Sequence, residues 1–212
     1  MPRGSLASVV VAALGCAGGG SPAAPDYLRY VAYDVGFEHV LLRWQEERMP
    51  LRVYLPAPPP RFVSDPEAVH DAVRDGITDW SDAAGPGVPS FRFVDDPGDA
   101  DIPIVWDSEP TSDFIAYCLY DVNAPQRRFG VARILVTARR DGREVPLEAL
   151  YLTVLHEMGH ALGLAGHSPE AGDVMYRTSS TSKGLTARDR ETLRLLYSKP
   201  NGTRVVGARS AD

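Results

Sequence analysis

The most constraining stretch of this chain runs from His156 to His167 and reads HEMGHALGLAGH. On an α-helix each residue advances by about 100°, so His156 and His160 lie on one face, one turn apart. Two neutral imidazoles at this spacing can bind one zinc ion at Zn–N distances of about 2.0–2.1 Å. Glu157 lies one step round the helix, where its carboxylate can hold a water molecule beside the ion without being a ligand. The stretch therefore predicts a metal site with an acid–base residue next to it.

The position of His167 predicts where this helix ends. A continuing helix would carry His167 about 10 Å along the axis from His160, too far for one ion to join the two. The chain must therefore leave the helix and fold back between them. Gly163 lies where this departure is needed, and glycine adopts the left-handed conformation of a helix C-terminus at little cost. We expect the helix to end at about residues 162–163 and His167 to be the third ligand.

This spacing resembles the zinc motif of the metzincin metalloproteases. The residues that follow, His167-Ser168 and then Asp173-Val174-Met175-Tyr176, are similar to those of the matrixins, which are the matrix metalloproteases and their bacterial relatives. In that family a methionine in a tight turn, the Met-turn, lies beneath the metal, and the resemblance implies this place for Met175. It also implies that residues 176–183, beginning with Tyr176, wall the pocket for the side chain after the scissile bond. The resemblance spans roughly residues 44–197, but only the second half carries specific motifs.

The resemblance implies a zinc-dependent endopeptidase that hydrolyses peptide bonds of proteins with a metal-activated water. His156, His160 and His167 would hold one zinc ion, and Glu157 would act as the general base. An extended substrate would pair with the edge strand of the cleft. Two alternatives stay open: a zinc-bound surface module that binds without catalysis, and another kind of zincin in which a distant glutamate replaces His167 as a ligand.

Other metal sites of related families are not expected here. Astacins and serralysins often carry a tyrosine ligand two places after the methionine, where this chain has Arg177. A second, structural zinc site needs three histidines, but only His39 and His70 remain, and we expect both to be surface or structural residues. Candidate ligands for calcium are acidic residues in one turn region, although such turns are usually only solvated: Asp95, Asp96, Asp99 and Asp101.

The N-terminus predicts export. Residues 1–16 combine a basic start with a short apolar run, Leu6 to Leu14, which is far too short to span a bilayer and is typical of a signal peptide. Gly15-Cys16-Ala17 resembles a bacterial lipoprotein cleavage site with Cys16 as the lipidated residue, although Ala13 stands where leucine is usual. The alternative is ordinary secretion with cleavage between residues 12 and 17. Residues 17–25 are glycine-rich and predict a flexible tether, so the protein would be a cell-envelope lipoprotein or a secreted protein.

The length and composition of the chain limit the kinds of binding partner that we expect. A chain of 212 residues predicts one domain plus appendages, and its net charge of −6 argues against nucleic-acid binding. We expect a polypeptide substrate, a membrane contact only through a lipid at Cys16, and a monomer. With Cys16 lipidated or removed, Cys118 has no intrachain partner, and we expect it to be a buried apolar residue.

The first part of the chain is the hardest to place. Residues 26–49, here called the lead-in segment, have an irregular apolar pattern and are either a short segment that packs on the domain or a remnant pro-segment. Matrixin zymogens are typically held inactive by a pro-segment cysteine, but the lead-in segment contains none. The catalytic domain is expected over residues 50–200, and residues 201–212 are expected to form a loose tail.

The pattern of residues 50–200 predicts an α+β (α/β zincin-type) domain with one mixed, twisted sheet, an active-site helix, a Met-turn and a C-terminal helix. Pro103 predicts that its strand runs near an edge or a bulge. Helices should begin at Asp65-Pro66, at Pro146 and at Thr186, the last with a capping box closed by Asp189. Expected strands are residues 51–55, 91–94, 100–106, 114–120 and 130–137. The core stripe of the active-site helix is expected to be Leu147, Leu150, Val154, Met158 and Ala161 or Leu162.

Overall fold

A computed structural model describes residues 26–35, 37–84, 88–107, 114–123, 125–178 and 180–208. The predicted signal peptide with Cys16 and the predicted tether lie outside these residues. None of the helices in the part that the structure describes combines the length and apolarity that crossing a bilayer requires.

The predicted α+β fold is confirmed. Its five-stranded sheet has the order β4-β3-β5-β7-β6, and the first four of these strands are parallel while β6 is antiparallel to β7 and forms an edge. The strands are β3 (Leu51–Tyr54), β4 (Phe91–Val94), β5 (Ile102–Trp106), β6 (Ala116–Asn123) and β7 (Arg128–Val136). Two small hairpins that the sequence pattern did not predict are β1 (Tyr33–Val35) with β2 (Glu38–Val40), and β8 (Arg139–Arg140) with β9 (Arg143–Glu144).

Two expectations for the strands are wrong. Pro103 lies in β5, the central strand, and not at an edge. It pairs with Tyr54, the last residue of β3, so the ladder between β3 and β5 ends at the residue that has no backbone N–H. Residues 121–129 are also not simply a connection, because β6 runs on to Asn123 and β7 begins at Arg128. Asp121, a residue that usually favours turns, falls at a register shift between Tyr120 and Val122.

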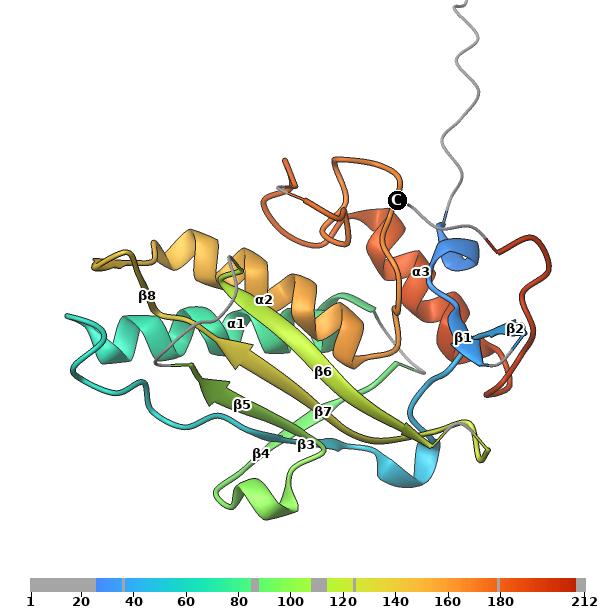
Figure 1. Cartoon of the computed structure of the whole chain (residues 1–212), viewed down its shortest axis with the longest axis horizontal. Coiled ribbons are helices and arrows are strands. Elements are labelled where there is room, and N and C mark those ends of the chain that lie inside the picture. The colour runs from blue at the N-terminus through green and yellow to red at the C-terminus, as the bar shows by residue number, and fades with distance from the viewer. Residues whose placement is uncertain are drawn as a thin grey trace, which may run out of the picture.

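Two long helices cover one face of the sheet (Figure 1). Helix α1 (Pro66–Ala84) begins at Asp65, whose side chain accepts a hydrogen bond from the Ala68 N–H at 3.1 Å, as predicted. Helix α2 (Leu147–Ala161) packs beside α1, between it and the edge strand β6. Leu150, Val154 and Met158 of α2 are fully buried, but Leu147 is exposed, since at the first helical position it does not yet reach the core.

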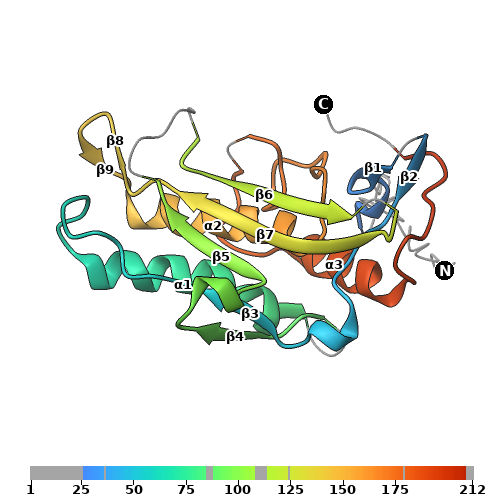
Figure 2. The same cartoon turned by 60° about the horizontal axis from the view of Figure 1, so that its bottom comes forward.

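Helix α3 (Ala187–Ser198) lies beyond the C-terminal end of α2 (Figures 1 and 2). Thr186 and Asp189 form the predicted capping box: the Thr186 hydroxyl accepts from the Asp189 N–H, and the Asp189 carboxylate accepts from the Thr186 N–H. Three single turns of 3-10 helix complete the fold: η1 (Leu28–Tyr30), η2 (Glu46–Arg48) and η3 (Pro97–Asp99).

The body of the protein extends beyond residues 50–200 at both ends. Tyr27, Val31, Leu42 and Trp44 of the lead-in segment are buried in the same core as the sheet and helices. The expected loose tail is paired in its first part: the Leu41 N–H donates to the Thr203 carbonyl at 2.8 Å, and the Val205 N–H donates to the His39 carbonyl at 2.9 Å. These two segments therefore lie side by side.

Candidate metal centre

The helix that carries His156 and His160 ends where the spacing predicted. Helix α2 stops at Ala161, and Gly163 follows in the left-handed region at φ 112°. A side chain at residue 163 would be strained there, and its Cβ would lie 2.5 Å from the Leu42 carbonyl oxygen. Gly163 therefore serves both the change of direction and a close backbone approach, and the chain returns over the end of α2 toward residue 167.

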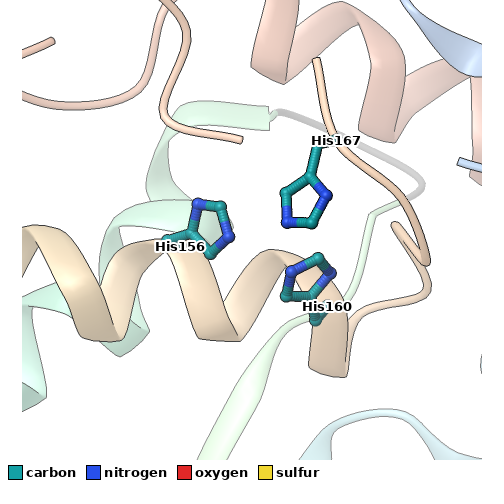
Figure 3. A group of neighbouring side chains, drawn as sticks. All are labelled: His156, His160 and His167. Carbon is teal, nitrogen blue, oxygen red and sulfur yellow. The ribbon is translucent and has the colours of Figure 1, made fainter. Parts of the chain in front are cut away.

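This reversal brings the three imidazoles together. The ring of His167 lies 5.0 Å from that of His160 and 5.4 Å from that of His156, measured between centroids. One nitrogen from each ring lies within 4.8 Å of those of the other two. Figure 3 shows the two rings on α2 and the third, on the following loop, turned toward one another. In the part of the chain that the structure describes, no other group of three or more histidine, cysteine or acidic residues comes together in this way.

Two of the rings are oriented by backbone carbonyls. His156 Nδ1 lies 2.7 Å from the Val174 oxygen, and His160 Nδ1 lies 2.6 Å from the Leu164 oxygen. A carbonyl only accepts, so each Nδ1 carries the ring proton and donates it, and each Nε2 keeps its lone pair. Such an orienting hydrogen bond is the usual companion of a metal-binding histidine.

The electrostatics favour neutral imidazoles. Burial lowers the pKa of His156, and burial together with the neighbouring histidines lowers the pKa of His160 to about 3. Near pH 7 both rings are therefore uncharged, which is the form that binds zinc. Three imidazoles that converge on one point fit a tetrahedral zinc ion with its fourth position open.

Glu157 directly follows His156 on α2 and is nearly buried, with 9% of its surface exposed. Burial raises the pKa of its carboxyl group to about 8, although a hydrogen bond from the Cys118 backbone opposes this shift. Cys118 belongs to β6, so the Glu157 carboxyl group lies against the edge strand. Cys118 itself is only partly buried, and its thiol is free.

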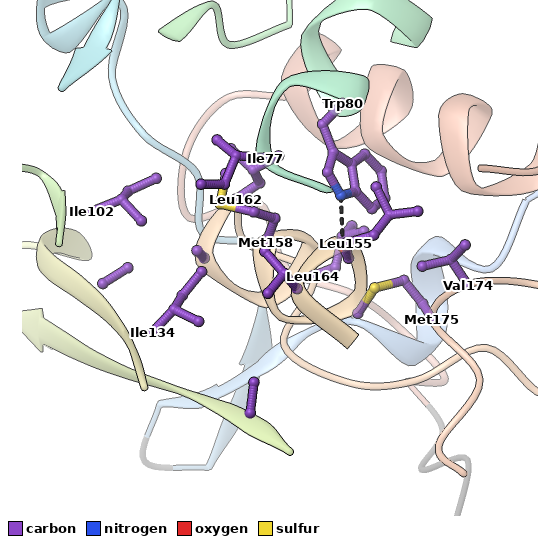
Figure 4. Close-up of a cluster of buried hydrophobic side chains, with 14 of the residues drawn as sticks. Ile77, Trp80, Ile102, Ile134, Leu155, Met158, Leu162, Leu164, Val174 and Met175 are labelled. Atoms are coloured by element: carbon purple, nitrogen blue, oxygen red, sulfur yellow. Dashed lines mark hydrogen bonds between the residues drawn. The ribbon is translucent and has the colours of Figure 1, made fainter. Parts of the chain in front are cut away.

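Met175 is fully buried in the core and lies against α2 at Gly159 (Figure 4). A Cβ added at Gly159 of α2 would stand only 2.2 Å from the Met175 sulfur and 3.0 Å from the Trp80 ring. Gly159 was not among the site residues predicted from the sequence. A glycine inside a helix lowers the stability of that helix by about 1 kcal/mol relative to alanine. A glycine at this unfavourable position was the sequence feature that could have indicated a close approach of another group to the helix.

The structure also places Tyr176 and the four aspartates that were candidate calcium ligands. The backbone of Tyr176 pairs with Ser168, directly after the third histidine; its part in a substrate pocket stays a prediction. Calcium finds no support among the four candidate aspartates. The Asp101 carboxylate already binds Arg48 and Arg52, and the Asp96 carboxylate accepts from the Gly98 N–H.

Comparison with known proteins agrees with this geometry. The matrixin family model matches residues 138–198, less than a third of the chain, and this part contains the three histidines, Glu157 and Met175. No curated protein matches the chain. The match supports a matrixin-like metalloprotease family for the segment that forms the metal centre.

Proposed function

We propose that this protein is a zinc-dependent endopeptidase. The observation that carries the proposal is the convergence of His156, His160 and His167 on one point, with the nearly buried Glu157 next to His156 on the same helix. The matrixin family match over the same residues supports it. Bound zinc would supply Lewis-acid polarisation of a water molecule and of a peptide carbonyl.

The residues of the chain would then do the following. The three imidazoles hold the ion and leave one position open, and the backbone carbonyls of Val174 and Leu164 keep the ring nitrogens aimed at it. Glu157 accepts a proton from the attacking water and passes it to the leaving amine. A cation close by favours the ionised carboxylate and so opposes the pKa rise that burial causes, which prepares Glu157 to act as a base.

The edge strand provides a place for an extended polypeptide. The outer side of β6 has no neighbour in the sheet, and Cys118 in the middle of β6 contacts Glu157. A peptide that adds to this edge through backbone hydrogen bonds would pass in front of the metal centre. Such binding reads the backbone rather than particular side chains, as a peptidase requires.

The test compares Glu157→Gln with Glu67→Gln, an exposed glutamate on α1, in digests of casein and a peptide library. We expect Glu157→Gln to lose about 10²–10⁴-fold in cleavage rate and to retain zinc by metal analysis, while Glu67→Gln cleaves like the wild type. Wild-type cleavage by Glu157→Gln would contradict the assigned base. A wild-type protein that binds zinc and cleaves nothing would instead be the non-catalytic binding module.

A further inference from the structure

The loop between the second and third histidines lies directly against the lead-in segment. The Ala165 N–H donates to the Val31 carbonyl at 3.2 Å. A Cβ added at Gly166 would lie 2.0 Å from the Tyr30 carbonyl oxygen, so only glycine fits beside His167. Together with the contact between Gly163 and Leu42, the backbone of Tyr30, Val31 and Leu42 therefore supports this loop.

The lead-in segment also holds the end of α2. Trp44 is buried, and its indole N–H donates to the Ala161 carbonyl at 2.8 Å. Ala161 is the last residue of the helix, so its carbonyl has no partner within the helix. Trp44 therefore supplies the hydrogen-bond donor for the carbonyl of the residue next to His160.

A second route leads from the lead-in segment to the first histidine. The Tyr27 hydroxyl donates to Asp189 at 2.6 Å, and the other oxygen of Asp189 accepts from the Val174 N–H at 3.0 Å. The carbonyl of the same Val174 accepts from the His156 ring. The Tyr27 N–H is also held, by the Thr192 hydroxyl of α3 at 3.0 Å.

We infer that the lead-in segment is a positioning segment for the zinc ligands, retained in the active protein, so that its removal inactivates the protein rather than activating it. The inference rests on the zinc site of the proposed function but not on peptide cleavage. Its physical basis is that the chain around each histidine is held by contacts that end on residues 27–44: backbone contacts for the loop that carries His167, the Trp44 indole at the residue after His160, and the side chains of Tyr27 and Asp189 for His156. It decides between the two alternatives that the sequence left open for residues 26–49, in favour of a segment that packs permanently on the domain.

The first experiment measures the zinc affinity of the full chain by competition with a chromophoric chelator. Gly166→Ala places a methyl group against the Tyr30 carbonyl and should displace His167, weakening zinc binding at least tenfold. The matched control is Gly172→Ala, because a Cβ there meets nothing within 4 Å and should leave zinc affinity unchanged. Far-UV circular dichroism of the zinc-free proteins checks that both variants are folded. Equal zinc affinity of the two folded variants would overturn the inference.

The second experiment does not depend on how Gly166→Ala folds. Replacing the exposed residues Glu46 and Glu47 of η2 with the recognition sequence of a site-specific protease allows the full chain to be cut at one place. We expect both fragments to stay together on gel filtration, with unchanged zinc affinity and no gain in peptide cleavage. Release of the lead-in segment with a rise in cleavage would identify a pro-segment and overturn the inference. If zinc binds as expected but no peptide is ever cleaved, only the proposed peptidase function fails.

Discussion

At the scale of single residues, the metal centre depends on where side chains are missing as much as on where they are present. Gly159 lies between His156 and His160 on α2, and the Met175 sulfur and the Trp80 ring occupy the space where its side chain would be. The Trp80 indole N–H also donates to the Leu155 carbonyl at 2.8 Å, which fixes the ring against α2. At Gly159 the surface of α2 therefore has no room for even a methyl group.

Gly159→Ala should consequently destabilise the protein although alanine is the better helix former. Overpacking in a filled core costs about 1–3 kcal/mol, which exceeds the propensity gain of about 1 kcal/mol. Urea unfolding of the zinc-free protein measures the change, with Gly172→Ala as the control for a glycine in open space. A Gly159→Ala protein as stable as the wild type would mean that Met175 can move aside without cost.

The histidines, Glu157 and Gly163 could be recognised from the sequence because their geometry follows from local helix spacing. Met175 could be placed only through the family resemblance, since nothing local links it to a helix that ends 14 residues earlier, at Ala161. Gly166 could not be recognised at all. Its neighbour is the carbonyl of Tyr30, more than a hundred residues away, and a glycine in a loop has many ordinary explanations.

At the scale of elements, Asp189 joins three segments. It closes the capping box of α3, binds the Met-turn through the Val174 N–H, and accepts the Tyr27 hydroxyl. The capping box was predictable because Thr186 and Asp189 are three residues apart. The other two contacts were not, because the same carboxylate satisfies partners that are 15 and 162 residues away along the chain.

Asp189→Asn should therefore affect more than the start of α3. An amide keeps the size of the side chain but turns an NH₂ group toward donors, and an unsatisfied buried donor costs about 1–3 kcal/mol. We expect a lower free energy of unfolding and weaker zinc binding than in Asp75→Asn, which changes an exposed aspartate of α1. Zinc binding as tight as in Asp75→Asn would show that the Met-turn does not depend on this carboxylate.

At the scale of the whole molecule, the sequence pattern predicted the class of fold but not the extent of the folded body. Residues 50–200 contain long periodic elements, and their order was predictable. Residues 26–49 and 201–206 contain only short, irregular apolar patterns, and they become ordered by pairing with each other. Arg43 illustrates this, since its backbone N–H donates to the Asn201 side chain at 3.0 Å. Pairings between segments so far apart leave no local signal.

An ion cluster around the buried Asp101 ties the lead-in segment to the sheet. Asp101, just before β5, binds Arg48 at the end of η2 and Arg52 of β3. Burial alone would raise the pKa of Asp101, but hydrogen bonds from Arg52 and the charges of both arginines outweigh it and hold that pKa below its usual value. Since the folded pKa is the lower one, this stabilisation is complete above the unfolded value of about 3.9 and is lost as the pH falls through the folded pKa.

Acid unfolding should report this cluster. We expect the free energy of unfolding of the wild type to fall as the pH drops below about 4, and Asp101→Asn to show a shallower fall from a lower starting value at pH 7. Urea unfolding at a series of pH values from 7 to 3 measures both slopes. Parallel slopes for the two proteins would show that Asp101 does not contribute to acid sensitivity.

The carbonyl groups that accept hydrogen bonds from the rings of His156 and His160 belong to the main chain at Val174 and Leu164. Every amino acid has a backbone carbonyl group, so no substitution at either position removes the hydrogen-bond acceptor. Mutational tolerance at residues 164 and 174 should therefore be limited by side-chain volume and not by loss of polarity. We therefore expect substitutions at residues 164 and 174 to leave the protonated nitrogen of each imidazole unchanged. We expect an insertion or deletion of a single residue in either loop not to be tolerated.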